Sequence, residues 1–265
     1  TALVVIENSK LDDMVTFSQS AVYDVESGSG NKLHMETGDE LSVEDCLYML
    51  LLLSSNQAAN ALAEHVAGSN AKFADMMNAR AAALGCTNTH FTNPHGLNDT
   101  NHYTTPHDMA LIARAAFQND TVKTVASTRT YTLPPTIKNP SGLTVTMGHK
   151  MLNPSDSRYY PGVIGGKTGY TSKAGNTLVT AVEKDGVRLI AVVMKSKSTH
   201  YTDTKAMFDY GFELAKAGAL GGSGTGGTAS PSGSGNAGPG TTAGKGWIQD
   251  SNGWYYVKDN GAKAS

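Results

Sequence analysis

The chain has 265 residues, 39% of them hydrophobic and 17% charged, which is enough for one sizeable core and an appendage. Its 21 basic and 23 acidic residues give a formal net charge of −2, so no charge excess points to nucleic acid or to an anionic membrane surface as a partner. No run of about 18 apolar residues occurs, and we therefore expect no transmembrane segment.

The first half of the chain is patterned for helices. Residues 1–8 are apolar and then stop at polar positions, as the final turns of a buried helix would. Ser42 is placed to cap a helix, and Thr105 before Pro106 is typical of another helix start. The polar pair Ser54-Ser55 breaks the pattern, and Gly85 supplies a stop. The predicted helices cover residues 1–8, 43–53, about 56–67, 70–84 and a segment that begins at 106.

After Thr128 the pattern changes to that of β-strands, predicted at residues 131–133, 143–147, 177–182 and 187–194. Asp185-Gly186 separates the last two and predicts a hairpin of central antiparallel strands. A last helix over about 202–217 should turn five apolar residues to the core: Met207, Phe208, Tyr210, Phe212 and Leu214. Helices, then a sheet, then a helix favour an α/β layer in which helices cover one sheet.

Residues 218–245 contain almost no bulky apolar side chain and are predicted to form a Gly/Ser/Thr-rich linker. Both tryptophans of the chain, Trp247 and Trp254, follow this linker. We therefore divide the chain into a globular domain (1–217), a linker (218–245) and a separate C-terminal segment (246–265).

The cysteines and histidines indicate no metal site. Cys46 and Cys86 are far apart and outside any Cys-x-x-Cys pattern, so they are either packed thiols or one disulfide. The pairs His90/His95 and His102/His107 are interrupted by prolines, and no His-Glu-x-x-His occurs. We expect these histidines to be structural, and we expect no metal and no cofactor.

Lys167-Thr168-Gly169 lies between an apolar stretch and the predicted hairpin, in a position that favours an edge strand facing a cleft. An ammonium, a hydroxyl and an unhindered backbone on one strand suit a substrate carboxylate whose peptide pairs with that strand. On its own the tripeptide is a weak signal, since it also occurs in ordinary turns.

Ser54-Ser55-Asn56 stands at the break between two apolar helices. Ser54 and Asn56 are two positions apart, so one hydroxyl for proton relay and one amide for orienting a peptide can face the same side. The alternative is that Ser54 or Ser55 merely caps the following helix, and both interpretations can hold together.

Ser-x-x-Lys, Ser-Asp-Asn and Lys-Thr-Gly together mark penicillin-binding proteins and class A β-lactamases, and this chain has counterparts of the last two. Four blocks resemble the low-molecular-weight D-alanyl-D-alanine carboxypeptidases: residues 51–64, 89–97, 102–110 and 166–171. The resemblance runs from Thr1 to about residue 217. It implies the penicillin-binding/β-lactamase-like α/β fold, an antiparallel sheet flanked by helices plus a helical subdomain, here lacking its N-terminal part.

The resemblance also implies roles for residues of this chain. Ser54 and Asn56 would relay protons and orient the substrate, while Lys167 and Thr168 of Lys-Thr-Gly would hold its terminal carboxylate. The backbone N–H of Tyr170, where the family commonly has His, would be one oxyanion donor. The nucleophilic serine and its lysine would lie about six residues before Thr1, so we expect the fragment itself to be inert in acylation.

The C-terminal segment resembles the choline-binding or cell-wall-binding repeat. Its aromatic residues would form hairpins and, with neighbouring repeats, cages for quaternary ammonium groups. One repeat cannot close a cage, so we expect further repeats beyond Ser265. The residues concerned are Trp247, Trp254, Tyr255 and Tyr256.

Together these features predict a secreted, penicillin-sensitive serine carboxypeptidase that trims D-Ala from peptidoglycan stem pentapeptides and stays at the cell wall or cell surface. Its partners would be the stem peptide, β-lactam antibiotics, and a wall polymer or choline. No export signal occurs in the sequence given. The alternatives are a non-catalytic wall-binding scaffold and, less favoured because residues 119–165 contain no Glu, a serine β-lactamase.

Overall fold

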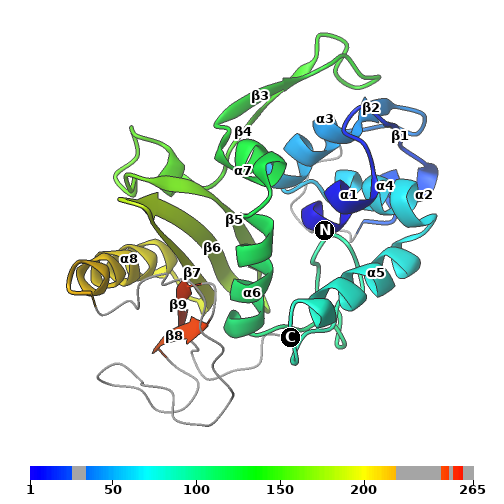
Figure 1. Ribbon diagram of the computed structural model, residues 1–265. Coiled ribbons are helices and arrows are strands. Elements are labelled where there is room, and N and C mark those ends of the chain that lie inside the picture. The colour runs from blue at the N-terminus through cyan, green and yellow to red at the C-terminus, as the bar shows by residue number, and fades with distance from the viewer. Residues whose placement is uncertain (26–33, 219–245, 251–252, 259–265) are drawn as a thin grey trace.

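The structure is a computed structural model that describes residues 1–25, 34–218, 246–250 and 253–258 (Figure 1). Its helical elements are α1 (Ala2–Asn8), α2 (Gln19–Tyr23), α3 (Val43–Tyr48), the π-helix η1 (Met49–Leu53), α4 (Asn56–Ala67), α5 (Asn70–Ala83), α6 (Pro106–Ala116), α7 (Asp120–Ser127), the 3-10 helix η2 (Lys150–Leu152) and α8 (His200–Lys216). Its strands are β1 (Met14–Thr16), β2 (Glu40–Ser42), β3 (Thr130–Leu133), β4 (Leu143–Thr146), β5 (Val163–Thr171), β6 (Gly175–Lys184), β7 (Val187–Ser196), β8 (Gly246–Asp250) and β9 (Gly253–Lys258).

The main sheet has the order β5-β6-β7-β9-β8, and β5, β6 and β7 are antiparallel neighbours. The predicted hairpin joins β6 and β7 through Asp185 and Gly186, whose φ angles of 52° and 77° both lie in the left-handed region. This two-residue turn matches the right-handed twist of the strands, which is why Asp-Gly predicted the hairpin correctly.

Helices cover both faces of the sheet (Figure 1). On one face α8 packs Met207, Phe208 and Phe212 against Leu178 and Leu189. On the other face α6 and α7 pack against the sheet through a second apolar cluster that includes Ala110, Ala113, Phe117, Ala126 and Val192. The α/β layer expected from the sequence is therefore confirmed.

The prediction for one of the five expected core residues of α8 was wrong. Tyr210 is 38% exposed, whereas Phe208 and Phe212 are buried. At about 100° per residue, Tyr210 lies on the far side of the helix from Phe208. The aromatic ring therefore faces outward, although Phe208 and Phe212, two positions away on either side, are buried.

A helical subdomain packs beside the sheet and holds the largest apolar cluster (Figure 1). Two helices of the described fold begin where the sequence placed caps: Ser42 and Asp45 form a capping box on α3, and Thr105 caps α6, ahead of Pro106, on the face of the main sheet. Ser69 caps α5, which the sequence did not predict. Val4 and Val5 bury α1 in this cluster, as the apolar opening of the chain predicted. The small sheets β1-β2 and β3-β4 complete the described fold.

The C-terminal segment forms a β8-β9 hairpin in which Trp247 pairs with Tyr256 and Gln249 with Trp254. β9 also pairs in parallel with β7, over Ile190 to Val193. The predicted linker lies outside the described residues apart from Gly218, the first of them. Among the helices that the structure describes, none has the length and apolar character required to cross a bilayer.

Candidate active site

The second motif sits at an irregularity in the helical subdomain. The apolar residues after Tyr48 form one wide π-turn, and the N–H of Ser54 donates to the carbonyl of Met49. Ser54 then adopts φ 59° and ψ 41°, the left-handed conformation that is uncommon for residues other than glycine. Ser55 caps α4 by accepting a hydrogen bond from the N–H of Ala58. Ser55 therefore caps the helix while Ser54 is left to face the cleft, so the two interpretations of the motif are compatible.

The backbone of Ser54 gives a prediction about stability. A side chain in the left-handed region costs about 1–2 kcal/mol, and glycine avoids this cost at some loss of unfolded-state entropy. We expect Ser54→Gly to be more stable than Ser54→Ala by about 1 kcal/mol. Both variants lack the hydroxyl, so a denaturant-unfolding comparison of the two isolates the backbone effect. Equal stabilities would contradict it.

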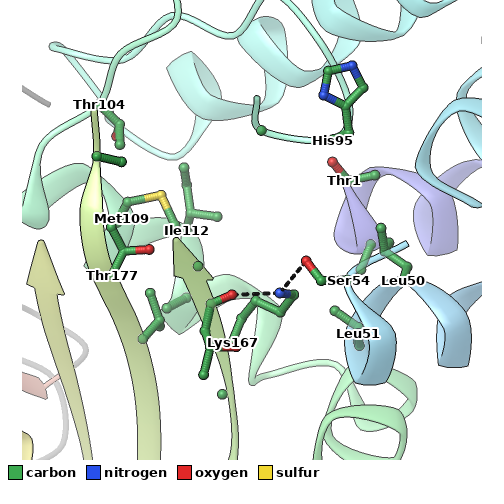
Figure 2. A pocket seen from close by; sticks show the side chains of 18 of the residues that line it. Thr1, Leu50, Leu51, Ser54, His95, Thr104, Met109, Ile112, Lys167 and Thr177 are labelled. Atoms are coloured by element: carbon green, nitrogen blue, oxygen red, sulfur yellow. Dashed lines mark hydrogen bonds between the residues drawn. The ribbon is translucent and has the colours of Figure 1, made fainter. Parts of the chain in front are cut away.

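The third motif lies on β5, at one end of the sheet, as predicted. Its Lys167 reaches across the cleft, where Nζ donates to Ser54 Oγ at 2.9 Å and to the Thr168 carbonyl at 2.6 Å (Figure 2). Residues 113 positions apart thus meet at one point. The two sequence motifs belong to one site.

The glycine of Lys-Thr-Gly has a packing reason. A Cβ atom at Gly169 would lie 2.5 Å from Oγ1 of Thr177, which is its partner on β6. A larger residue at the third position of the motif would therefore require the Thr177 hydroxyl to turn away while the strands stay paired.

Burial lowers the pKa of Lys167 to about 8. The side chain points into a cleft where the charged form is poorly hydrated, and desolvation disfavours the cation. Near neutral pH the amine is still mainly protonated. It can therefore attract an anionic group, and it has less water to lose than a lysine on the open surface.

A cavity of about 800 Å³ surrounds Lys167 and Ser54. Thr168, Gly169, Tyr170 and the buried Asn56 line it, so every predicted site residue of the globular domain borders one space. Its other walls are largely apolar and include Leu50, Leu51, Met109 and Ile112 (Figure 2). Tyr170 is 71% exposed, which agrees with a role for its backbone and not its ring.

The loop after α5 forms the opposite wall, and the sequence only partly foresaw this. Residues 93–97 belong to one of the four blocks that resemble the family, and His95 among them lines the cavity (Figure 2). Asn98 and Thr171 were not singled out, yet Thr171 Oγ1 donates to Asn98 Oδ1 at 3.2 Å and joins the end of β5 to this loop. No pattern in the sequence links these two residues, because they meet only when the loop after α5 and the end of β5 come together in the folded chain.

Asp108 anchors this loop to α6. Its fully buried carboxylate accepts hydrogen bonds from the Asn88 N–H at 2.8 Å and from Thr89 Oγ1 at 2.7 Å, and it contacts His107 Nδ1 at 3.1 Å. Burial alone would raise the pKa of Asp108, but these hydrogen bonds outweigh it and hold the pKa below the ordinary 3.8. The ionised carboxylate therefore stabilises the cleft wall.

We expect Asp108→Ala to lower the free energy of unfolding by about 2–4 kcal/mol, because it leaves buried donors without a partner. Because the folded pKa is lowered, this stabilisation is present above pH 3.8 and is lost as the pH falls through the lower folded pKa. Thermal unfolding at neutral and acid pH measures both effects. Asp99→Ala removes from the same loop an exposed carboxylate that accepts the N–H of Asn101, and it should lower stability by only about 1 kcal/mol; an equal loss in both variants would refute the anchor.

Three of the four histidines considered in the sequence, His90, His95 and His102, lie in loops, whereas His107 lies on α6. His90 Nδ1 lies 2.7 Å from the Asn101 carbonyl, and His102 Nδ1 accepts the N–H of Thr92. Burial lowers the pKa of His95 to about 4, with a smaller contribution from His102. In the part of the chain that the structure describes, no group of three His, Cys, Asp or Glu side chains could hold a metal ion. There, Cys46 and Cys86 are free thiols, the first of the two alternatives.

Two Ser-x-x-Lys tetrapeptides occur within the chain, Ser29–Lys32 and Ser69–Lys72. The first lies outside the described residues. In the second, Ser69 caps α5 and accepts the N–H of Lys72, and neither residue lines the cavity. The described tetrapeptide is thus a helix cap with no part in this site.

The side chains of the predicted wall-binding residues Trp247, Trp254, Tyr255 and Tyr256 lie outside what the structure describes. Their backbones form the β8-β9 hairpin. The family model for a putative cell wall binding repeat matches residues 245–263.

Known proteins resemble the rest of the chain. The curated D-alanyl-D-alanine carboxypeptidases DacF of Bacillus subtilis and DacB2 of Mycobacterium tuberculosis are 31% and 35% identical, over 77% and 69% of this chain. The matches cover 50% and 62% of these two relatives, so the chain spans little more than half of their length. The D-alanyl-D-alanine carboxypeptidase of a Streptomyces species is 34% identical over 81% of this chain and 76% of its own.

Solved structures agree. A mutant of a Streptomyces DD-transpeptidase superposes with a TM-score of 0.71 at 31% identity, covering 80% of this chain and 85% of its own. A putative penicillin-binding protein homologue from Mycobacterium tuberculosis gives 0.70 at 32% identity, with 80% and 79% covered. The family model for D-alanyl-D-alanine carboxypeptidase matches residues 1–198. With Ser54 and Lys167 in contact on the expected fold, the chain belongs to the D-alanyl-D-alanine carboxypeptidase family.

Proposed function

We propose that the protein from which this chain comes is a serine-type D-Ala-D-Ala carboxypeptidase that acts on peptidoglycan stem peptides. The observation that supports this most directly is the 2.9 Å contact between Lys167 Nζ and Ser54 Oγ at the edge of a roomy cleft. A cation, a hydroxyl and an edge strand lie together there. That combination suits a peptide that ends in a carboxylate.

In this proposal the substrate lies along β5. Lys167 and Thr168 hold its terminal carboxylate, and its backbone pairs with the strand at Gly169. Asn56 orients the scissile peptide, and the N–H of Tyr170 donates to the oxyanion. The partly desolvated ammonium of Lys167 supports the first of these roles, because charge pairing strengthens where water is scarce.

The nucleophile is the serine of a Ser-x-x-Lys motif, which the family resemblance puts about six residues before Thr1 in the parent protein. Thr1 borders the same cavity, which supports an approach from that side (Figure 2). The serine oxygen would attack the carbonyl carbon, the bond to the terminal D-Ala nitrogen would break, and the serine proton would pass to the leaving amine. Ser54 and Lys167 suit the proton relay, and water would then hydrolyse the acyl-enzyme.

The test uses the parent protein and a labelled penicillin. We expect the parent protein to be acylated and to release D-Ala from a pentapeptide that ends in D-Ala-D-Ala. The present chain, without the motif serine, should do neither. If the parent protein binds the pentapeptide and releases no D-Ala, the non-catalytic scaffold is correct. Fast release of the labelled penicilloyl group would instead indicate a β-lactamase.

The lowered pKa of Lys167 predicts an alkaline limit. As the Lys167 amine loses its proton above pH 8, its attraction for the terminal carboxylate of the substrate weakens. The value of kcat/KM should then fall about tenfold per pH unit. The folded pKa lies below the usual 10.5, so the folded state binds fewer protons between pH 8 and 10.5, and the contribution of Lys167 to stability rises there. Activity and stability should therefore diverge. A pH-rate profile of the parent protein measures the fall, and a flat profile to pH 10 would contradict it.

We also propose that the C-terminal segment attaches the enzyme to the cell wall outside the cell. The match of residues 245–263 to a putative cell wall binding repeat supports this. Sedimentation with purified walls, with and without residues 246–265, tests it. Competition by choline separates a choline cage from attachment to another wall polymer, and equal sedimentation of both proteins would overturn the proposal.

A further inference from the structure

His149 is buried directly behind the strand that carries Lys167. It is 1% exposed and lies between β4 and η2. Its Nε2 is 2.8 Å from Oγ1 of Thr180, which is itself fully buried on β6. The imidazole is thus attached to the strand that pairs with β5. It borders neither the cavity nor solvent.

The ring also fills the space above Gly166, the residue before Lys167. Gly166 and Thr180 are register partners. A Cβ atom at Gly166 would lie 2.5 Å from Cδ2 and 2.6 Å from Nε2 of His149. The imidazole therefore takes the place that a side chain at position 166 would occupy. It contacts both partners of one pair in the β5-β6 ladder.

On its other side the ring packs edge-on against Tyr201 of α8, with centroids 5.8 Å apart. The Tyr201 hydroxyl accepts the N–H of Lys150 at 3.1 Å, which holds the residue next to His149. The neighbouring Gly148 approaches Thr168, since a Cβ there would be 3.7 Å from Thr168 Oγ1. The segment around His149 therefore joins α8 to the strand positions on each side of Lys167.

The imidazole is neutral near pH 7, because burial lowers the pKa of His149 to about 4. Lys167 and His200 act in the same direction, and backbone hydrogen bonds oppose them. The ring of Tyr201, which packs on His149, also faces a cation: the Arg158 guanidinium lies 5.2 Å from its centroid. Arg158 is in turn hydrogen-bonded to Asp156. A neutral ring can lie beside the Lys167 ammonium without repulsion.

We propose that His149 is a positioning residue for Lys167 and Thr168: by bonding Thr180 and packing on Gly166, its ring fixes where β5 presents the ammonium and the hydroxyl to the cleft. The effect of His149 on catalysis rests on the proposed function. Its effect on the position of Lys167 is independent of that function.

The first test is a readout at Lys167 that requires no catalysis. With ¹³C-methylated lysines, NMR titration follows the Lys167 amine, and amide hydrogen exchange follows β5 and β7. In His149→Ala, water should replace the ring, so the pKa of Lys167 should rise by half a unit or more towards its ordinary value. Exchange at Lys167 and Thr168 should quicken about tenfold, with β7 unchanged.

A matched pair at Thr180 isolates the hydrogen bond and remains informative if His149→Ala does not fold. Thr180→Val keeps the shape and loses the hydroxyl, and should shift both Lys167 readouts in the same direction. Thr180→Ser restores the hydroxyl and should match the unaltered chain. In the parent protein, Thr180→Val should raise KM for the pentapeptide several-fold more than it lowers kcat.

An unchanged Lys167 in folded His149→Ala, or in Thr180→Val, would overturn the proposal. Equally faster exchange throughout the sheet would also overturn it, because that result indicates a merely structural role. If the Lys167 readouts shift as expected and the parent protein releases no D-Ala, the positioning role stands and only the proposed function fails.

Discussion

Replacing Lys167 by methionine in the parent protein is expected to lower kcat/KM for a D-Ala-D-Ala peptide by on the order of 10²–10³-fold. Methionine retains much of the side-chain volume in the apolar cleft and removes both the charge and the donor to Ser54 at 2.9 Å. The substrate carboxylate then loses its counter-charge in a poorly hydrated site. Steady-state D-Ala release and the rate of acylation by a labelled penicillin both measure the loss.

Lys173→Met is the matched control. Lys173 follows β5 in the turn to β6 and is exposed, and it does not line the cavity. The Lys173→Met substitution removes the same charge from the same end of the sheet, so a general electrostatic effect would appear in both variants. A fall of less than tenfold in Lys167→Met, or a similar fall in Lys173→Met, would contradict the anchoring role.

Gly166→Ala is expected to lower the free energy of unfolding by about 3 kcal/mol and to remove most activity. The added methyl group would lie 2.3 Å from the Val179 carbonyl and 2.5 Å from His149. The carbonyl is backbone and cannot turn aside. The pairing of β5 with β6 must therefore open beside Lys167. Chemical denaturation and the acylation rate measure the two losses.

Gly148→Ala provides the comparison. A Cβ atom at Gly148 meets Thr168 Oγ1 at an ordinary 3.7 Å, and the backbone there needs no positive φ. Stability should change by less than about 0.5 kcal/mol. If the two alanine variants behave alike, steric closure at Gly166 is not what holds β5 in place.

The elements that the sequence predicted best are those with local causes. Asp185-Gly186 specified the β6-β7 turn, and Ser42 and Thr105 specified helix starts, because each acts on its own backbone. Lys167 could be placed on an edge strand because an apolar stretch precedes it and the predicted hairpin follows it. Motif chemistry then suggested that Lys167 and Ser54 share a site, and the structure brings them into contact.

Contacts between distant segments left no such signal. Asn98 and Thr171 meet only because the loop after α5 packs against the end of β5 in the folded chain. The role of His149 becomes visible only when β5 and β6 are paired, since its ring packs on Gly166 of that pair. The parallel pairing of β9 with β7 was likewise not expected, since a linker separates them in the sequence. Tyr210 shows the converse error, where composition suggested burial and the helix phase opposed it.

Because the π-turn spans Met49–Leu53, the direction in which the Ser54 side chain points depends on the number of residues in that turn. Relative to an α-helix, a π-turn accommodates about one extra residue, and each residue of a helix turns the chain by about 100°. Deleting a single leucine from Leu51–Leu53 would let regular hydrogen bonding resume and would swing the hydroxyl away from Lys167, even though every side chain at the site were unchanged. Length along this stretch is therefore as much a determinant of the cleft as residue type, and homologues should tolerate exchanges among its leucines far better than a deletion.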